Sequence, residues 1–554
     1  MTAALTGAIL GLDVVVIEKT GQIGGTSARS AGSVWVPNSR HSRPGTDSFE
    51  AALTYLRQAV GNRLDQERIT GFLQAAPEMV DFLEDNSPVK LRAYPYHPDY
   101  LADLDGASLS GRVVEPLPFN AAVLGPAFAN LRPPLAEFML FGGMMVDRTD
   151  IGHLLGATRK MASFWHSIKL LTGYGRDRLR YRRGARLVMG NALVGRLYHA
   201  LLQRRVPVLL STTVTSLAHE NGRVTGVVIN SKDQRSEIQV RAGVVLATGG
   251  ISNNPALRKS LMPAALFNTS PVVDSATGDG LTLAGPAGGH LSRDHDSNSF
   301  LAPLSRRRRG DGSIAVFPHF VLDRGKPGIL AVDPGGNRFV NEATTYHLFG
   351  KALLATLARF PGRGCFLICD DPFMARYGLG MVRPKRLGLD AAVRDGYVIR
   401  AGTLAELAEK AGLPGDATAA AVARHNGFAS DGVDQDFAKG EDAYQQNLGD
   451  PAHSPNPCLG ACASPPFYAL EIFPGDIGAS TGLVTNAAAQ VLDENGNPIA
   501  GLYACGNDME SIMAGFYPGP GITLGPAMTF GFVAARHAHA AAATPGTLGK
   551  GEKS

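Results

Sequence analysis

The stretch DVVVIEKTGQIGGTSARSAGS (13–33) joins a short apolar run to a loop rich in glycine and hydroxyl side chains. The β-branched run DVVVIEK (13–19) predicts a strand, and the Ala- and Leu-rich segment before it predicts a helix. A helix, a tight turn at Gly11 and a strand that ends in Glu18 match the second half of a βαβ nucleotide-binding unit. In such a unit the acidic residue after the second strand binds the adenosine ribose.

The chain starts inside the helix of that unit, so the first strand and the G-x-G-x-x-G phosphate loop are absent. We therefore expect the natural protein to begin roughly 15 to 30 residues earlier. Taken alone, Glu18 fits a plain parallel-sheet strand equally well. The next loop favours a ligand site, because Gly24 and Gly25 let a ligand approach the backbone. Thr26 and Ser27 offer hydroxyls and amides to a phosphate or a flavin, although a purely structural turn is the alternative.

Further pieces of a nucleotide domain lie at both ends of the chain. Residues 206–229 predict a strand and then a hairpin around Asn221–Gly222. AGVVLATGG (242–250) predicts a buried strand that runs into a glycine turn, and GLYACGND (501–508) repeats that pattern. These are the pieces of a flavoprotein that holds FAD in an extended pose.

The predicted fold is α/β: a Rossmann-like FAD-binding domain, lacking its N-terminal strand and glycine loop, with an inserted α+β catalytic domain. Residues 1–297 form the first part of the FAD-binding domain, and 298–474 form the catalytic and substrate domain. Residues 475–554 form the second part and a C-terminal tail. A further insertion covers 116–190.

The 116–190 insertion predicts apolar helical pieces at FMLFGGMMV (138–146) and KMASFWHSIKLL (160–171), followed by the basic run GRDRLRYRRGAR (175–186). It could cap an active site, rest on a membrane surface, or be a simple packing excursion. The basic run and a second one, SRRRRG (305–310), are typical of solvated loop charge; an anionic membrane or an acidic partner is the alternative.

Bulk composition describes an ordinary globular protein of 554 residues, 44% hydrophobic and 18% charged, with room for two or more domains. The net charge of +4 is too small for its length to suggest nucleic acid. Five scattered cysteines indicate neither a disulfide framework nor a metal site, so we expect a reducing, cytoplasmic location. The apolar N-terminus carries Asp13 and Glu18 and lacks a basic start, which argues against a signal peptide. No apolar run reaches the roughly 18 residues of a membrane span.

GFYPGPGITLGPAMTFGF (515–532) is the most discriminating stretch, because a rigid Pro-Gly-Pro-Gly turn carries one tyrosine and leads into a helix. With it, the chain resembles flavoproteins related to fumarate reductase, and within them the 3-ketosteroid 1-dehydrogenases, which introduce the 1,2 double bond into the steroid A ring. The other matching motifs, spread over nearly the whole chain, are GGTSARSAGSVWVPNS (24–39), ATGG (247–250), GNRFVNEATTYHLFGKAL (336–353), GDIGASTGLVTN (475–486) and GLYACGN (501–507).

The resemblance implies a division of roles. It places the carbonyl-binding phenol at Tyr517 and a backbone donor at Gly521, an oxyanion-hole pair on a ketone. It places the proton-abstracting base at Tyr346, within TTYHLFG, and a helper at Tyr100, within RAYPYHPDY. A tyrosine's ordinary pKa is about 10, so neighbours must poise Tyr346 as a base. A hydride from the β-carbon then reaches N5 of the flavin.

The helper position is the loosest match, because two residues are inserted in this chain and either Tyr96 or Tyr94 could hold the role instead. The resemblance also implies FAD as cofactor, an external electron acceptor, and a helix over 525–532 whose positive end faces the flavin pyrimidine. The expected FAD contacts are Glu18, Lys19, Gly24, Gly25, Thr26, Ser27, Val214, Ala247, Thr248, Gly249, Gly506, Asn507, Thr523 and Leu524.

Two other functions remain open from the sequence. The same machinery could act on a non-steroid ketone or enone, as a desaturase or a reductase. Alternatively, the chain without a phosphate loop could be an inactive fragment that loses FAD. Flavin colour in the purified protein would separate the enzyme from the fragment.

Overall fold

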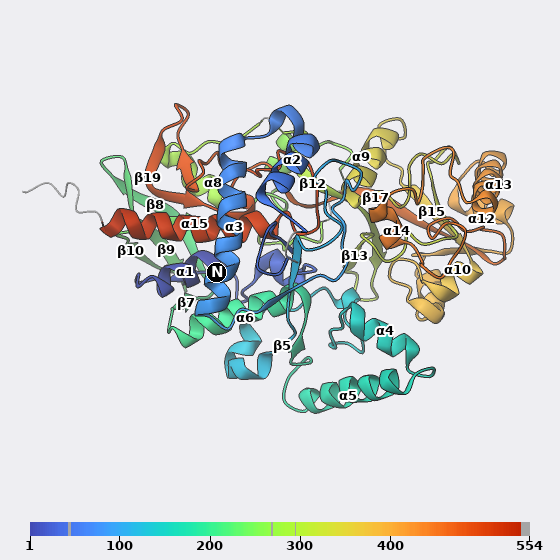
Figure 1. Cartoon of the computed structure of the whole chain (residues 1–554), viewed down its shortest axis with the longest axis horizontal. Helices are drawn as coiled ribbons and strands as arrows, with labels where there is room; N and C mark the ends of the chain where they lie inside the picture. Colours follow the sequence, from blue (N-terminus) through green and yellow to red (C-terminus); the bar gives the residue numbers. More distant parts are fainter. Residues whose placement is uncertain (43–45, 267–269, 294, 544–554) are drawn as a thin grey trace, which may run out of the picture.

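The computed structural model describes residues 1–42, 46–266, 270–293 and 295–543. A six-stranded sheet gathers strands from both ends of the chain (Figure 1). Its members are β8 (Thr212–Glu220), β9 (Arg223–Ser231), β10 (Gln234–Gln239), β11 (Val244–Leu246), β18 (Gln490–Leu492) and β19 (Pro498–Ala504). β11 and β19 run parallel, with Val245 opposite Tyr503, which confirms the predicted α/β fold and joins segments about 250 residues apart in sequence. The predicted hairpin at Asn221–Gly222 is also confirmed, because both residues have positive φ and connect β8 to β9.

A second six-stranded sheet is built from the middle of the chain, and the long strand β17 runs through it. Its members are β12 (Ser299–Arg308), β13 (Ile314–Pro318), β14 (Ile329–Val332), β15 (Cys365–Asp370), β16 (Ile399–Ala401) and β17 (Phe467–Ala479). Helices surround it: α9 (Tyr346–Leu357), α10 (Asp371–Arg376), α11 (Leu389–Arg394), α12 (Leu404–Ala411), α13 (Gly415–Asp431) and α14 (Ala443–Leu448). The domain boundaries given above stay predictions.

The N-terminal segment forms helix α1 (Thr2–Ile9) and then a short strand β1 (Val16–Ile17), which pairs in parallel with β7 (Val208–Leu209). The order of helix, turn and strand agrees with the sequence, although β1 is shorter than the predicted run of 13–19. Val14 and Val16 line a cavity that also reaches β11.

The remaining helices are α2 (Phe49–Val60), α3 (Gln66–Asn86), α4 (Arg148–Gly156), α5 (Met161–Arg178), α6 (Met189–Gln203), α7 (Pro255–Leu261), α8 (Asp279–Ala284) and α15 (Leu524–Ala543). The helix predicted over 160–171 is α5. The helix predicted over 138–146 is wrong. Phe141 and Gly142 have φ of 48° and 72°, and the chain reverses there so that Leu140 pairs with Met144. Adjacent glycines favour such a turn because they accept positive φ without a side-chain clash.

A small sheet of β2 (Val34–Trp35), β4 (Val113–Pro116) and β3 (Leu91–Ala93) packs against α15 through β2 and against α6 through β4. Two further short strands, β5 (Phe119–Asn120) and β6 (Arg186–Leu187), bracket the 116–190 segment. The ring of Trp35 stacks on Phe72 of α3 at 6.1 Å, and Phe72 stacks on Phe530 of α15 at 6.5 Å. Packing of these three buried rings fixes the position of α15 relative to β2.

Arg112 is the charged centre of this region and is 2% exposed. Its guanidinium donates to Asp99 at 2.7 Å and to Asp47 at 2.8 Å. Asp99 also accepts from the Trp35 indole at 2.8 Å and from the backbone of Ser108 at 3.0 Å. The side chains of Asp47, Asp99 and Trp35 are buried, so the network ties the segment around Asp99 to β2 and β4 with charge-assisted hydrogen bonds.

We expect Arg112→Leu to lower the free energy of unfolding by about 3 to 5 kcal/mol, because it leaves two buried carboxylates without a cation. The thermal unfolding midpoint would report the change. Arg241→Leu is the matched control, since the Arg241–Asp13 pair is 3.4 Å long with both side chains about 90% exposed, and its loss should cost less than about 1 kcal/mol. Equal midpoints for the two variants would contradict the structural role of Arg112.

Candidate active site

One cavity of about 1790 Å³ connects the N-terminal glycine loop, the parallel strands and the Pro-Gly-Pro-Gly turn. It reaches from the glycine loop to the tyrosines, and it also includes the space between β1 and β11. Every residue predicted to contact FAD or to act on the substrate lines it. They are Glu18, Lys19, Gly24, Gly25, Thr26, Ser27, Tyr100, Val214, Ala247, Thr248, Gly249, Tyr346, Gly506, Asn507, Tyr517, Gly521, Thr523 and Leu524.

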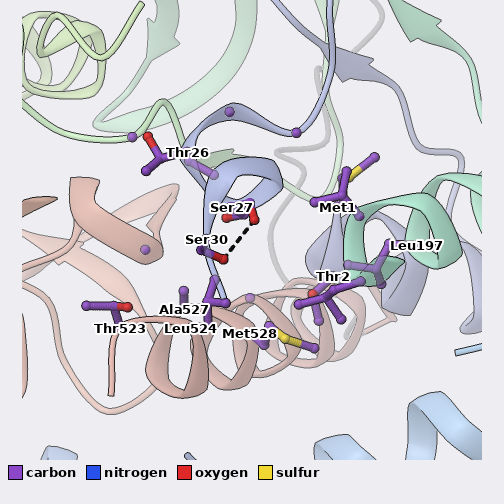
Figure 2. Close-up of a pocket in the computed structure, with 18 of the residues that line it drawn as sticks. Met1, Thr2, Thr26, Ser27, Ser30, Leu197, Thr523, Leu524, Ala527 and Met528 are labelled. Atoms are coloured by element: carbon purple, nitrogen blue, oxygen red, sulfur yellow. Dashed lines mark hydrogen bonds between the residues drawn. The ribbon is translucent and has the colours of Figure 1, made fainter. Parts of the chain in front are cut away.

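The glycine end of the cavity is formed by a 3₁₀ turn, η1 (Gly25–Arg29), that faces the first turn of α15. Figure 2 shows Thr26, Ser27 and Ser30 on one side of this space and Thr523 and Leu524 on the other. The Ser30 hydroxyl donates to the Ser27 carbonyl at 2.8 Å, which holds the turn closed.

This end of the cavity fits the FAD that the sequence predicts. Gly25 and Gly249 have φ of 51° and 101°, and a Cβ added at Gly25 would meet no atom within 4 Å. A Cβ at Gly249 would meet only Ala276, at 3.8 Å. Both positions therefore leave open space that a ligand can fill close to the backbone. Backbone amides in such turns favour phosphate groups.

Glu18, Lys19 and Asp508 lie near this end of the cavity, and each has its own hydrogen-bond partners. Glu18 accepts from the Thr20 amide and hydroxyl, both at 2.8 Å through Oε1, so its carboxylate is held at the end of β1. The Lys19 ammonium donates hydrogen bonds to Asp279 and Thr277 at 2.7 Å each, and these bonds hold it in the wall of the cavity. Asp508, which the sequence reasoning missed, is fully buried and accepts from the amides of Thr248 and Gly250.

Asp508 holds the glycine turn after β11 against the loop after β19. Burial raises the pKa of its carboxyl group, while the Thr248 and Gly250 amides favour the charged form. The GND sequence after the strand was the available signal, because an acidic residue that follows a glycine turn often binds backbone amides.

Three tyrosines meet at the other end of the cavity. The Tyr100 hydroxyl donates to the Tyr346 hydroxyl at 3.3 Å, and their rings meet edge to face at 5.5 Å. Tyr517 lies 5.0 Å from the Tyr346 ring and 5.8 Å from the Tyr100 ring. All three are less than 10% exposed. Segments far apart in sequence thus place three phenols within reach of one bound molecule.

Neighbouring phenols and burial control the charge of this group. Burial, and then the nearby Tyr100 and Tyr517, raise the pKa of Tyr346 well above its ordinary value. Burial also raises the pKa of Tyr517. Tyr444, another residue missed from sequence, packs 4.7 Å from Tyr100, and burial raises its pKa to about 12. The phenols are therefore neutral hydrogen-bond donors until a ligand or base changes their surroundings.

The Pro518 carbonyl ties two of the tyrosine segments together. It accepts from the Tyr100 amide at 2.9 Å and from the Tyr55 hydroxyl. The Tyr55 hydroxyl in turn accepts from the Leu101 amide at 3.2 Å. Tyr55 on α2 is 0% exposed, so this junction is dry. It fixes the spacing between Tyr100 and the turn that carries Tyr517.

Gly521 lies where the turn crosses β2. Its φ is 87°, and a Cβ there would approach the Ser33 carbonyl to 2.5 Å, so only glycine fits. Its carbonyl accepts from the Trp35 amide at 3.2 Å and from Gly525 at 2.8 Å. No described residue accepts a hydrogen bond from the Gly521 N–H. Gly521 and Tyr517 both line the cavity, shortly before the start of α15.

The alternative helpers lie differently from Tyr100. Tyr96 is 43% exposed, and Tyr94 packs edge-on against His97 at 4.9 Å. Neither forms a ring contact with Tyr346 among the described residues. The structure therefore favours Tyr100 as the neighbour of Tyr346.

Comparisons with known proteins agree with this site. A family model described as an FAD binding domain matches residues 1–524. A 3-oxosteroid 1-dehydrogenase of Mycobacterium tuberculosis is 37% identical over 556 residues, covering 97% of this chain and 96% of that protein. The chain belongs to the FAD-binding family that contains the 3-oxosteroid 1-dehydrogenases.

Other members of this flavoprotein family are about as similar. A 4-oxocyclohex-2-ene-1-carboxylate 5-dehydrogenase of Sinomonas cyclohexanicum is 35% identical over 541 residues, covering 97% of this chain and 91% of that one. The crystal structure of a 3-ketosteroid delta1-dehydrogenase from Sterolibacterium denitrificans in complex with 1,4-androstadiene-3,17-dione has a TM-score of 0.89 and 36% identity, over 98% and 97% of the two chains.

We expect Glu18→Ala to weaken FAD retention while the fold is kept. A carboxylate on ribose hydroxyls contributes charge-assisted hydrogen bonds of about 1.5 to 3 kcal/mol, which corresponds to roughly tenfold or more in affinity. Flavin absorbance after extensive dialysis measures the retained fraction. Glu220→Ala, an exposed change at the end of β8 outside the cavity, is the control. Unchanged flavin content in the Glu18 variant would remove Glu18 from the site.

Proposed function

We propose that this flavoprotein removes two hydrogens from adjacent carbons beside a ring ketone, as a 3-ketosteroid 1-dehydrogenase. The observation that carries the proposal is the convergence of Tyr100, Tyr346 and Tyr517 at one end of a cavity whose other end is a glycine-lined cradle. FAD, when bound there, supplies the two-electron oxidant that accepts a hydride.

Tyr517 and Gly521 hold the ketone oxygen in this proposal. A phenol O–H and a backbone N–H that point at one oxygen form an oxyanion hole, and each donor is typically worth about 2.7 to 4 kcal/mol in the transition state. The support is geometric: the Gly521 N–H has no acceptor among the described residues, and the rigid turn sets its distance from the phenol. Polarising the carbonyl acidifies the C–H bond next to it.

Tyr346 takes the α-proton as a tyrosinate. Its phenol oxygen lies 3.3 Å from the Tyr100 hydroxyl, which donates a hydrogen bond and so stabilises the charged form. Thr345 caps α9 by accepting from Leu348 at 3.2 Å, and this fixes Tyr346 at the first helical position. Phe320 and Phe300 pack against Tyr346 and Tyr517 at 4.9 and 5.1 Å, and they exclude water from the phenols.

Apolar side chains at this end of the cavity support an apolar ketone as substrate. Phe320, Val321, Leu322 and Leu448 line it near the tyrosines. Each turnover removes two electrons from the substrate, so the proposal includes an external electron acceptor.

A second candidate substrate is a monocyclic ketone that carries a carboxylate. Arg148 and Lys326 also line the cavity, and Arg148 forms no salt bridge with any described residue. An unpaired guanidinium at the rim could bind the carboxylate of such a ring. The relative from Sinomonas cyclohexanicum is named for a substrate of this class.

We expect Tyr346→Phe and Tyr517→Phe to act differently on anaerobic flavin bleaching by 4-androstene-3,17-dione. Tyr346→Phe removes the proposed base and should slow bleaching by at least about 10²-fold, while ligand binding persists because the phenyl ring still fills the pocket. Tyr517→Phe removes the proposed carbonyl donor and should slow bleaching by about 10² to 10³-fold. It should also weaken ketone binding, since that donor acts in the ground state too.

The same assay contains its own controls. Tyr397→Phe removes a buried hydroxyl that bonds Ser305 outside the cavity and should leave bleaching unchanged. Full-speed bleaching by the Tyr346 variant would overturn the base assignment. Bleaching of the unmutated holoprotein by 4-oxocyclohexanecarboxylate and not by the steroid would favour the second substrate class.

We expect the flavin reduction rate to increase with pH. Burial raises the pKa of Tyr346, so near neutral pH only a small tyrosinate fraction exists, and that fraction grows about tenfold per pH unit below the pKa. His97 and His347 nearby do not titrate in this range, because burial lowers the pKa of each to about 4. Stopped-flow reduction between about pH 6 and 9 measures the slope. A flat profile would contradict a tyrosine base.

A further inference from the structure

Arg324 is a fully buried arginine in the segment between β13 and β14. Its guanidinium donates hydrogen bonds to four backbone carbonyls. Nε donates to His319 at 2.7 Å, and one terminal nitrogen donates to Phe320 at 2.8 Å. The other terminal nitrogen donates to Glu342 at 2.7 Å and also to Thr344. Because burial of a charge is costly unless its donors are satisfied, these contacts fix where the guanidinium lies.

The carbonyls that bind Arg324 belong to two segments beside the proposed reaction site. Two of them lie in the loop that continues into Phe320, Val321 and Leu322, which line the cavity. The other two lie just before α9, whose first residue is Tyr346. One side chain therefore joins the cavity wall to the start of the helix that carries Tyr346.

Arg324 also contacts α9 directly. The centre of its guanidinium lies 5.4 Å from the centroid of the Phe349 ring, which is fully buried in the first turn of that helix. A cation over an aromatic ring is attracted by the electron-rich face of the ring. The same guanidinium thus binds the carbonyls before α9 and a ring within it. The position of Tyr346 relative to the cavity wall therefore depends on Arg324.

The charge of Arg324 forms no ion pair with a carboxylate of any described residue. Asp323, the preceding residue, is bonded by His319 at 2.6 Å and by the Gly380 amide at 3.1 Å. Its other oxygen accepts from the backbone amide of Arg324 at 2.8 Å. In the part of the chain that the structure describes, the guanidinium is thus a buried positive charge without a directly bonded anion.

This charge acts on the phenols beside Tyr346. Burial raises the pKa of Tyr100 and of Tyr444, and the positive charge of Arg324 opposes part of both rises. Tyr444 packs 4.7 Å from Tyr100, whose hydroxyl lies 3.3 Å from that of Tyr346. Once Tyr346 has lost its proton, the Tyr100 hydroxyl is the donor between them. A nearby cation makes a phenol a stronger donor, and a stronger donor stabilises the anion that it faces.

We propose that Arg324 is a positioning residue for proton abstraction: its guanidinium holds the first turn of α9 against the cavity wall, and its charge strengthens the Tyr100 hydrogen bond to the deprotonated Tyr346. Arg324 does not line the cavity, so it acts through these residues and not on the ketone. The role rests on the proposed function, because it serves the proton removal assigned there to Tyr346.

Two substitutions separate the contacts of Arg324 from its charge. Arg324→Lys keeps the positive charge, but a single ammonium cannot bond the carbonyls of both segments as the planar guanidinium does. Arg324→Gln loses the same contacts and also the charge, while its amide still offers a donor to a carbonyl. Stopped-flow measurements on the flavin-loaded proteins give the rate of anaerobic flavin reduction at saturating 4-androstene-3,17-dione and the dissociation constant of the ketone.

We expect Arg324→Lys to slow flavin reduction by about tenfold, because small misplacements of a reacting group lower rates steeply. Arg324→Gln should be slower again by roughly fivefold or more, because it also removes the charge. The dissociation constant should change by less than about twofold in both, since the proposed ketone donors belong to the turn of Tyr517. A purely structural loss would not be partly rescued by lysine, and it would not spare ketone binding.

The route through Tyr100 has its own test. In a Tyr100→Phe background the charge has no hydroxyl to strengthen, so Arg324→Lys and Arg324→Gln should differ by less than about twofold. A difference that persists undiminished in this background overturns the route through Tyr100.

Arg196 on α6 provides a matched control. Its guanidinium also donates to backbone carbonyls, those of Pro88, Leu117 and Pro118, and it lies 5.4 Å from the centroid of the Phe119 ring. Arg196 is absent from the cavity lining. Arg196→Lys and Arg196→Gln should therefore reduce flavin at the unmutated rate, even where they lower the thermal unfolding midpoint.

The remaining outcomes each overturn a stated part of the proposal. Full-speed reduction by folded Arg324→Lys and Arg324→Gln rejects it, as does weaker ketone binding at an unchanged reduction rate. Equal rates in the two variants reject the role of the charge. Arg324→Met serves as the neutral variant if Arg324→Gln does not hold flavin. Failure of the steroid to bleach the unmutated holoprotein rejects the proposed function instead, and the same comparison is then made with 4-oxocyclohexanecarboxylate.

Discussion

The hydrogen bonds that meet at the Pro518 carbonyl set the geometry on which the rest of the site depends. They join the loop of Tyr100 to the turn of Tyr517, and Asp99, one residue before Tyr100, is anchored by Arg112 and Trp35. The spacing between Tyr100 and Tyr517 is therefore maintained by a buried network of protein groups. Misplacement of reacting groups by even about 1 Å can cost 10²-fold in rate, which explains why so much buried charge is committed to this loop.

The phenol group presents an electrostatic conflict. A base must become an anion, yet burial and two neighbouring phenols raise the pKa of Tyr346. Burial raises the pKa of Tyr100 as well, and the positive charge of the buried Arg324, which lies outside the cavity, opposes part of that rise. In the proposed function the same dry surroundings strengthen the donors to the ketone oxygen, because a low dielectric amplifies every charge interaction within it. Proton removal and carbonyl polarisation, as proposed, are thus both governed by the low dielectric of the pocket.

Local patterns predicted most of the secondary structure and the cavity wall. The hairpin at Asn221–Gly222, the strands β11 and β19 and helix α15 each have turn residues and an apolar run that point to one structure. The helix over 138–146 failed because an apolar run alone does not separate a helix from a glycine turn. Asp508, Tyr55 and Tyr444 escaped notice because their partners lie far away in sequence. Only the folded chain brings Tyr444 to Tyr100, or Asp508 to the turn after β11.

The Pro-Gly-Pro-Gly turn makes tolerance to mutation very uneven across the site. A side chain at Gly519 would approach the Trp35 indole nitrogen to 2.8 Å, and one at Gly521 would meet the backbone of β2, so neither position can vary without displacing the core. The opposite wall, formed by Phe320, Val321, Leu322 and Leu448, presents side chains to the cavity. Changes that adapt the cavity to other ketones are therefore expected at those side chains, whereas Gly519 and Gly521, on the turn that carries Tyr517, leave no room for a larger residue.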